Sequence, residues 1–275
     1  MRETTLPALA ERYDLFLVDQ FGVLHDGARP YPGAPDALRR LRDDGRRVAI
    51  LSNSGKRARL NEERLVRLGF DPGSWDLFLS SGEVARERLA AERTEPGAPR
   101  TVLVLSRDGD LSVIDGLGLA PVGRAEDADL VLLAGSEAPR LTLADYGERL
   151  RPAAARKTPA LCANPDLAML TPDGLAFSAG RIARLYEELG GPVTWIGKPH
   201  PAIYRAVLAR FPDARRAVGV GDSVEHDVSG AKNAGLHAAL VRGTGVHAGL
   251  DAAGLEAECE RHRAVPDHVL SRFAW

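Results

Sequence analysis

The sequence predicts an α/β fold in which a parallel sheet has helices on both faces and is interrupted by an inserted α/β domain. Short apolar runs recur along the chain, and helical patterns separate most of them. This alternation is typical of βαβ units. Two turn-rich stretches, residues 93–99 and 171–180, enclose one strand–helix series. We therefore expect that series to form a separate insertion.

The predicted strands are apolar runs, and the first two are each followed by a helical pattern. The runs cover residues 15–18, 47–51, 77–79, 102–105, 130–134, 160–162, 193–196, 217–220 and 238–241. Helical patterns span residues 33–44 and about 56–68. The insertion is placed at residues 98–178, so residues 1–97 and 179–275 would build one discontinuous core domain.

Composition excludes several classes of protein. The 275 residues are 44% hydrophobic and 27% charged, as in soluble globular proteins. A net charge of −2 offers no field for nucleic acid or anionic membrane. The chain has only two cysteines, Cys162 and Cys259, far apart in the sequence, which excludes a disulfide scaffold and most zinc modules. The chain shows no signal-peptide pattern at residues 1–14 and no apolar run near the roughly 20 residues of a membrane span. We expect a cytoplasmic protein.

Carboxylates stand at the ends of two predicted strands. The first run ends in Asp19, and ligands of open α/β sheets bind at the carboxyl ends of strands. The run 217–220 is followed by Asp222 and Asp227. Two carboxylates on one turn favour a bound cation, and hard divalent cations prefer oxygen ligands. The alternative is that Asp19 and Asp222 cap the following helices.

Two further segments carry groups suited to an anion. The run 47–51 leads into Ser52-Asn53-Ser54-Gly55 and a basic helix start. A hydroxyl and backbone N–H groups at a helix N-terminus bind anions, although Ser54 could also be an ordinary N-cap. Lys198 follows the run 193–196 and could act as a point charge for phosphate or lie on the surface.

The four segments together are more specific than any one of them. In chain order they supply a carboxylate, a hydroxyl, a lysine and an acidic pair. Phosphoryl transfer through an aspartyl-phosphate needs these parts, since it requires a nucleophilic carboxylate, a metal and a phosphate cradle.

The motifs DQFGVLHDG, LSNSG, GKPHPAIY and GDSVEHDVSGAKNAG resemble those of the haloacid dehalogenase superfamily. Within it they resemble the class IIA branch, which includes nucleotide, phosphoglycolate and pyridoxal phosphatases. The resemblance covers nearly the whole chain. It implies a Rossmann-like core and a large α/β cap between the second and third motifs, in agreement with an insertion at 98–178.

The resemblance also implies roles for individual residues of the core. Asp19 would attack phosphorus and would bind Mg²⁺ together with Asp222, Asp227 and the backbone carbonyl of Phe21. Such positive charge is required because an anionic nucleophile otherwise repels a phosphate dianion.

Further residues would bind the substrate. Ser52, with Asn53 and Ser54, would hold the phosphate, and Lys198 would neutralise both the phosphate and Asp19. In the cap, CANPD at 162–166 resembles an ATNPD element, which makes the Asn164 and Asp166 side chains candidate substrate contacts. Their alternative role is to form a turn around Pro165.

One position departs from the family pattern. Family phosphatases usually carry a second Asp two residues after the nucleophile, as general acid and base, and here that residue is Phe21. General acid–base catalysis contributes about 10²–10⁴-fold. His25, whose intrinsic pKa suits proton transfer, is the first candidate substitute, and His200 and His226 are further candidates. The alternative is that each is a surface or packing histidine.

The expected function is therefore Mg²⁺-dependent hydrolysis of a small phosphorylated metabolite, slow or restricted to leaving groups that need no proton, such as aryl or acyl phosphates. The resemblance also makes a homodimer plausible. The alternative is a catalytically impaired phosphometabolite-binding protein on the same fold. A nucleotide-dependent dehydrogenase is disfavoured, because Gly243-Thr244-Gly245 with Ala248 is followed by only 27 residues, too few for a Rossmann half.

Overall fold

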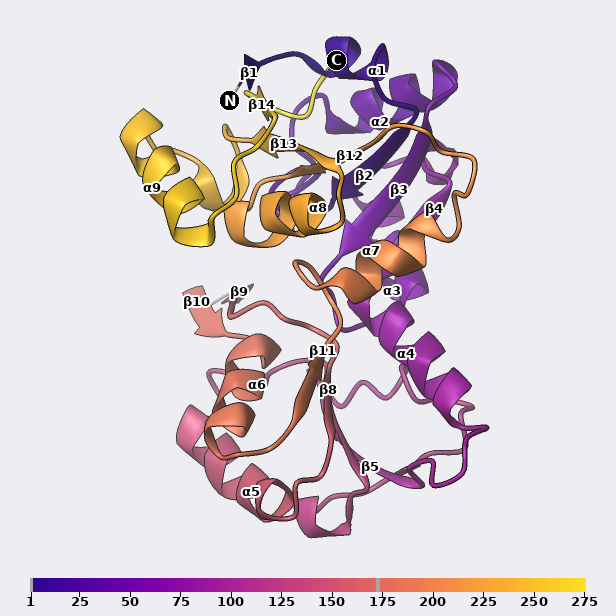
Figure 1. Ribbon diagram of the computed structural model, residues 1–275, viewed down its shortest axis with the longest axis vertical. Coiled ribbons are helices and arrows are strands. Elements are labelled where there is room, and N and C mark those ends of the chain that lie inside the picture. The colour runs from indigo at the N-terminus through magenta and orange to yellow at the C-terminus, as the bar shows by residue number, and fades with distance from the viewer. Residues whose placement is uncertain (1, 172–173) are drawn as a thin grey trace. The chain divides into compact units, whose positions relative to one another are not determined.

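The computed structural model describes residues 2–171 and 174–275, which form two compact units. The first comprises the residues up to Ser52, Arg59–Leu79 and Lys198–Trp275, and the second comprises Asn53–Ala58 and Ser80–Gly197 (Figure 1).

The first unit is built on a seven-stranded sheet with the strand order β1-β14-β13-β12-β2-β3-β4. Its strands are β1 (Arg2–Glu3), β2 (Leu15–Asp19), β3 (Arg47–Ser52), β4 (Leu77–Ser80), β12 (Ala217–Gly221), β13 (His237–Val241) and β14 (His268–Leu270). The pairings β1–β14, β14–β13, β13–β12, β12–β2 and β2–β3 are all parallel. Strand β2 reads LFLVD and its four apolar residues are buried, as expected for a strand covered on both faces.

Helices cover both faces of this sheet. They are α1 (Leu6–Ala10), α2 (Ala34–Asp43), α3 (Ala58–Arg67), α7 (Pro201–Leu208), α8 (Ser229–Asn233) and α9 (Ala252–His262), with short turns η1 (Pro72–Ser74), η3 (Val224–Val228) and η4 (Gly245–His247). The chain moves from β2 through α2 to β3 in one direction across the sheet, and from β12 through α8 to β13 in the other. Since parallel crossovers are right-handed, α2 and α8 lie on opposite faces. Figure 1 shows α8 in front of the strands.

Helix α2 illustrates why these segments are helical. Its buried residues are Ala34, Ala37, Leu38 and Leu41, a spacing that places them in one apolar stripe against the sheet. A proline in its first turn lacks an N–H that the helix could not have used.

The second unit contains a five-stranded parallel sheet with the order β11-β8-β7-β5-β6 and an antiparallel hairpin of β9 and β10. Its elements are α4 (Ser81–Glu92), β5 (Thr101–Leu105), β6 (Ala120–Pro121), η2 (Ala125–Asp127), β7 (Leu130–Leu133), α5 (Leu143–Ala155), β8 (Ala160–Cys162), β9 (Ala168–Thr171), β10 (Gly174–Phe177), α6 (Ala179–Glu188) and β11 (Val193–Trp195). Tyr146 of α5 and Tyr186 of α6 pack into one core with Leu103, Val131 and Leu133.

The predicted fold class is confirmed, and each predicted apolar run forms a strand. The limits of the units differ from the predicted insertion at 98–178. Strand β11 pairs with β8, so the chain returns to the first unit only at Lys198. Helix α4 belongs to the second unit, where Arg86 donates to the carbonyls of Val113 and Asp115.

The turn-rich stretch 171–180 also contains more regular structure than expected. Residues 172–173 lie outside the described residues, while Gly174–Phe177 form β10 and α6 starts at Ala179.

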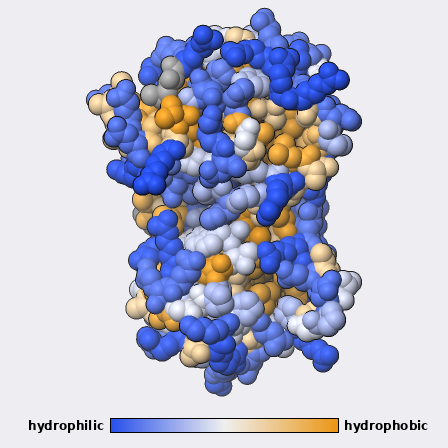
Figure 2. Space-filling view, viewed as in Figure 1, coloured by the Kyte–Doolittle hydropathy of each residue, from blue (hydrophilic) through white to orange (hydrophobic). Residues whose placement is uncertain are grey.

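No helix among residues 2–171 and 174–275 is long and apolar enough to cross a membrane. On the face shown in Figure 2, hydrophilic residues predominate and the hydrophobic ones form separate small patches.

Candidate active site

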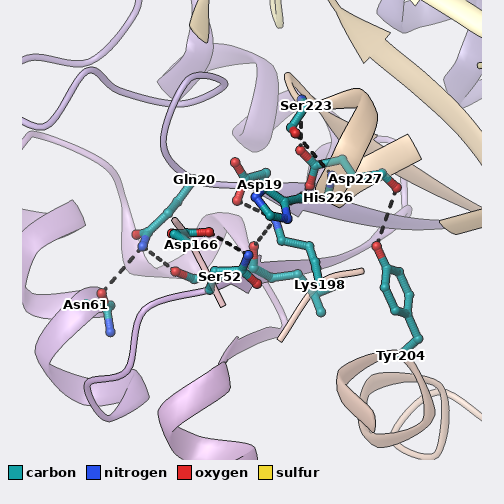
Figure 3. Close-up of polar contacts among 12 residues, drawn as sticks. Asp19, Gln20, Ser52, Asn61, Asp166, Lys198, Tyr204, Ser223, His226 and Asp227 are labelled. Carbon is teal, nitrogen blue, oxygen red and sulfur yellow. Dashed lines mark hydrogen bonds and ion pairs between the residues drawn. The ribbon is translucent and has the colours of Figure 1, made fainter. Parts of the chain in front are cut away.

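Three carboxylates and one ammonium meet at the carboxyl end of the seven-stranded sheet. Asp19 ends β2, Asp222 follows β12, and Asp227 lies in the π-helical turn η3. One carboxylate oxygen from each lies within 4.8 Å of the others. The Nζ atom of Lys198 donates to Oδ1 of Asp19 at 2.6 Å and to Oδ1 of Asp227 at 2.7 Å (Figure 3). The structure therefore brings together the side chains of four of the five residues predicted for the nucleophile and metal site, the fifth being Phe21 through its backbone carbonyl.

Lys198 does not follow a strand of the sheet that carries this cluster, although its sequence context indicates that it does. The strand before it, β11, belongs to the sheet of the second unit. Lys198 itself lies in the first unit, just before α7, and also donates to the carbonyl oxygen of Leu51 at 3.3 Å. It therefore contacts groups at the ends of β2 and β3 without belonging to a strand of that sheet.

Burial and mutual repulsion control the protonation of the cluster. Burial, followed by the charge of Asp227, raises the pKa of Asp19 to about 7 despite the opposing effect of Lys198. Burial and the charges of Asp19 and Asp227 raise the pKa of Asp222 well above its ordinary value. Burial alone would lower the pKa of Lys198, but the two carboxylates that it contacts raise it overall. Lys198 therefore stays protonated.

Close backbone packing fixes the two carboxylates that follow β12. Oδ2 of Asp222 accepts a hydrogen bond from Val246 N at 2.7 Å, and Oδ2 of Asp227 accepts one from Ser223 N at 3.1 Å. Gly22 and Gly245 both have positive φ, and a Cβ atom at either would overlap the Asp222 carboxylate. Glycine is thus required on both sides of Asp222.

The donor set of this cluster fits a divalent cation. Its three carboxylates are hard oxygen ligands of the kind that Mg²⁺ prefers. Three carboxylates, two of them buried, facing one ammonium also leave an excess of negative charge, which makes the cluster unfavourable without a further cation.

Ser52 lies beside this cluster at the end of β3 and is buried. Its hydroxyl oxygen accepts a hydrogen bond from Nε2 of Gln20 at 2.5 Å, and the same nitrogen lies 3.5 Å from Oδ1 of Asn61 (Figure 3). Gln20 was not among the predicted site residues. A polar side chain directly after an apolar strand was the available signal, but sequence does not show which way it points.

The other predicted phosphate- and substrate-binding residues make contacts within the second unit. Asn53 Nδ2 donates to Oδ1 of Asp166 at 2.8 Å, and Asp166 N donates to Oδ1 of Asn164 at 3.1 Å. Ser54 Oγ accepts from Lys56 N at 3.3 Å. The contact between Asn164 and Asp166 is the turn that the alternative interpretation predicts. A role for these residues in binding substrate stays a prediction.

Phe21 and His25 form an aromatic pair after β2. Phe21 is 40% exposed, and its ring meets the His25 ring edge to face with 4.4 Å between the two centroids. The Arg64 guanidinium lies 5.6 Å from the Phe21 ring centroid. His25 is fully buried, and its Nδ1 accepts a hydrogen bond from Gly27 N at 2.9 Å. Burial and the nearby Arg64 charge lower the pKa of His25 to about 4. A neutral, inaccessible imidazole is poorly suited to be the general acid.

Comparisons with known proteins agree with this geometry. A family model described as haloacid dehalogenase-like hydrolase matches residues 16–120, and a second, HAD-hydrolase-like model matches residues 195–274. The chain is 30% identical over 250 residues to the D-glycerol 3-phosphate phosphatase of Mycobacterium tuberculosis, covering 90% of this chain and 67% of that protein.

Two solved structures are similar over the whole chain. A haloacid dehalogenase-like hydrolase of Brucella suis has a TM-score of 0.83 at 29% identity and covers 99% of both chains. A glycerol phosphate phosphatase of Mycobacterium tuberculosis in complex with magnesium has a TM-score of 0.76 at 27% identity, covering 99% of this chain and 78% of that one.

Proposed function

Because the chain belongs to the haloacid dehalogenase-like hydrolases, we propose that it is a Mg²⁺-dependent phosphatase that hydrolyses a small phosphorylated metabolite through Asp19. The observation that carries this proposal is the buried cluster in which Lys198 bridges Asp19 and Asp227 beside Asp222. Similar proteins that are named as phosphatases, one of them solved with magnesium, support it.

In the proposed reaction a carboxylate oxygen of Asp19 attacks phosphorus. The bond between phosphorus and the leaving oxygen breaks, and its electron pair stays on that oxygen. Water then attacks the phosphorus of the aspartyl-phosphate, releasing inorganic phosphate and restoring the carboxylate. Lys198 favours the ionised form of Asp19 and neutralises incoming charge, and the Ser52 hydroxyl binds a phosphate oxygen.

Asp19, Asp222 and Asp227, with the backbone carbonyl of Phe21, would hold the Mg²⁺. When bound, the metal supplies positive charge to the phosphate oxygens. Removing Mg²⁺ with a chelator should therefore abolish turnover.

The leaving group departs without a protein proton donor in this proposal. Phe21 cannot transfer a proton, and the burial of His25 weighs against it as a substitute. Preferred substrates are thus aryl or acyl phosphates, whose leaving groups are stable as anions. The Phe21→Asp substitution should raise turnover of alkyl phosphates more than that of aryl phosphates.

The second unit is proposed to be the cap that excludes water and selects the substrate, with Asn164 and Asp166 as candidate contacts. A homodimer is likewise a prediction, which the mass of the protein in solution would test.

The direct test is hydrolysis of 4-nitrophenyl phosphate by wild type with Mg²⁺, with chelator, and by the Asp19→Asn variant. We expect turnover only by wild type with Mg²⁺. Phe21 also motivates the second candidate, a phosphometabolite-binding protein. That candidate is supported if wild type binds inorganic phosphate by calorimetry but hydrolyses no aryl phosphate.

A further inference from the structure

We propose that Gln20 is a positioning residue that orients the Ser52 hydroxyl for the substrate phosphate. This inference rests on the proposed function, because it assigns Gln20 a task only if Ser52 binds phosphate. Gln20 lies between Asp19 and Phe21 and is 1% exposed. Its Nε2 donates to Oγ of Ser52 at 2.5 Å.

The register of the sheet makes this contact direct. Asp19 of β2 pairs with Leu51 of β3, so the residues that follow them, Gln20 and Ser52, leave neighbouring strands at the same level. The nucleophile and the phosphate contact are thereby linked across two adjacent strand ends. A displacement of either strand end would change both.

The direction of the hydrogen bond determines what Ser52 can donate. In the Gln20 contact the amide is the donor and the hydroxyl oxygen is the acceptor, so this contact does not use the proton of the hydroxyl. A hydroxyl held through its oxygen is oriented while its own proton can be directed to a phosphate oxygen. A residue that accepted from Ser52 would instead compete with the phosphate.

The rest of the Gln20 environment argues against a purely structural role. Its Oε1 is buried without a hydrogen-bond partner among the residues that the structure describes. An unsatisfied buried carbonyl is unfavourable, and methionine or leucine would fill a similar volume without it. The donor group of Gln20 is therefore the feature that a buried apolar side chain could not replace. The second contact, to Asn61 at 3.5 Å, steadies the amide from helix α3.

The experiment is a double-mutant cycle between Gln20→Met and Ser52→Ala. Methionine keeps the shape of glutamine and removes its donor. We measure kcat and KM for 4-nitrophenyl phosphate with Mg²⁺ and the inhibition constant of inorganic phosphate. Gln20→Met should lower kcat/KM by about tenfold and weaken inhibition by phosphate, as expected for losing one well-placed hydrogen bond. The double variant should be no worse than Ser52→Ala alone. Asn61→Ala, which leaves the 2.5 Å contact in place, serves as the matched control and should lose less than Gln20→Met.

A second variant keeps the test decisive if Gln20→Met does not fold. Gln20→Glu preserves size and polarity but replaces the donor with an acceptor, so it should reduce kcat/KM more than loss of the donor alone. The inference is overturned if Gln20→Glu or Gln20→Met has the kcat/KM of wild type. It is also overturned if the fold-losses in kcat/KM of Gln20→Met and Ser52→Ala multiply in the double variant. Absence of turnover in wild type would overturn the proposed function instead, so the two failures are distinguishable.

Discussion

Aspartates at the amino end of the seven-stranded sheet have different partners from aspartates at its carboxyl end. At the amino end, Asp14, Asp76 and Asp267 each stand one residue before a strand. Asp14 accepts hydrogen bonds from the backbone N–H groups of Arg215 and Arg216, both at 3.0 Å. Asp76 accepts from Val48 N at 2.7 Å and Asp267 from Ala238 N at 2.8 Å. At the carboxyl end, Asp19 and Asp222 lie in the buried cluster with Lys198.

The polarity of parallel strands explains the difference. The amino end of a parallel sheet presents backbone N–H groups, and the carboxyl end presents carbonyl oxygens. Burial would raise the pKa of Asp14 and Asp267, but backbone donors lower it overall. The pKa values of Asp19 and Asp222 are raised instead. A carboxylate on the carbonyl side therefore needs a cation, which is why such positions indicate function.

The sheet of the second unit repeats the amino-end arrangement. Asp129 stands one residue before β7 and accepts from Arg100 N at 2.8 Å and Thr101 N at 3.0 Å, beside the start of β5. These backbone donors lower the pKa of Asp129. An aspartate directly before an apolar run is thus a structural cap in both sheets.

The largest expected effect comes from exchanging the carboxylate at each end of β2. Asp19→Asn should lower kcat by at least about 10³-fold, because it removes the nucleophile. Asp14→Asn should leave kcat within about twofold and lower the free energy of unfolding by about 1 kcal/mol. Hydrolysis of 4-nitrophenyl phosphate and urea unfolding measure the two quantities. Comparable turnover by the two variants would contradict the comparison.

Asp76→Ala should affect stability alone. Asp76 accepts from Val48 N and forms ion pairs with Arg42 at 2.9 Å and Arg47 at 3.0 Å. Its loss leaves a strand amide without its acceptor, so the free energy of unfolding should fall by about 2 kcal/mol. Urea denaturation checks this, with kcat as the control. An unchanged unfolding midpoint would show that the cap does not contribute.

Asp222→Asn should change the free energy of unfolding in the opposite direction to Asp76→Ala when no metal is bound. At a pH above the raised pKa of Asp222, the substitution removes one buried negative charge and keeps an oxygen that can accept from Val246 N. In chelator, the free energy of unfolding should rise by about 1 kcal/mol. Added Mg²⁺ should then stabilise wild type more than the variant, which keeps the other proposed ligands. A variant that is less stable than wild type in chelator would argue against repulsion within the cluster.

A further expected difference is in the pH dependence of stability. The folded-state pKa of Asp19 is about 7, above the ordinary value of 3.8, so the folded protein holds that proton more tightly. Metal-free wild type should therefore lose stability relative to Asp19→Asn as pH rises from about 4 to 7, by at most about 1.4 kcal/mol per pH unit. The lowered pKa of Asp267 gives the reverse sign, since its contribution is lost as pH falls below the ordinary value. Unfolding curves in chelator at several pH values separate the two, and parallel curves for wild type and Asp19→Asn would refute the expectation.

The sequence was sufficient to predict the strands that are buried on both faces of a sheet. Their continuous apolar runs, such as that of β2, are distinctive. Strands β1 and β14 have two and three residues, too few to show a period. The hairpin strand β10 exposes Leu175 to 76% and so resembles a turn-rich segment.

The sequence was enough to predict which residues of the candidate site lie close together, but not how each side chain is positioned. Asp19 and Ser52 end two strands of one parallel sheet and Asp222 follows a third, and such strand ends share an edge. The position of Lys198 depended on β11 joining the second sheet, whereas the run 193–196 was predicted to belong to the core domain. The orientation of Gln20 and the burial of His25 depend on packing between distant segments, and a single sequence carries no signal for either.

Lys198 also makes the site a late event in folding. Its partners Asp19 and Leu51 lie 179 and 147 residues away along the chain, so the cluster cannot form until segments from both halves of the sequence have come together. Recovery of catalysis after dilution from denaturant would consequently report completion of the whole chain's assembly, and should trail the return of helical circular dichroism.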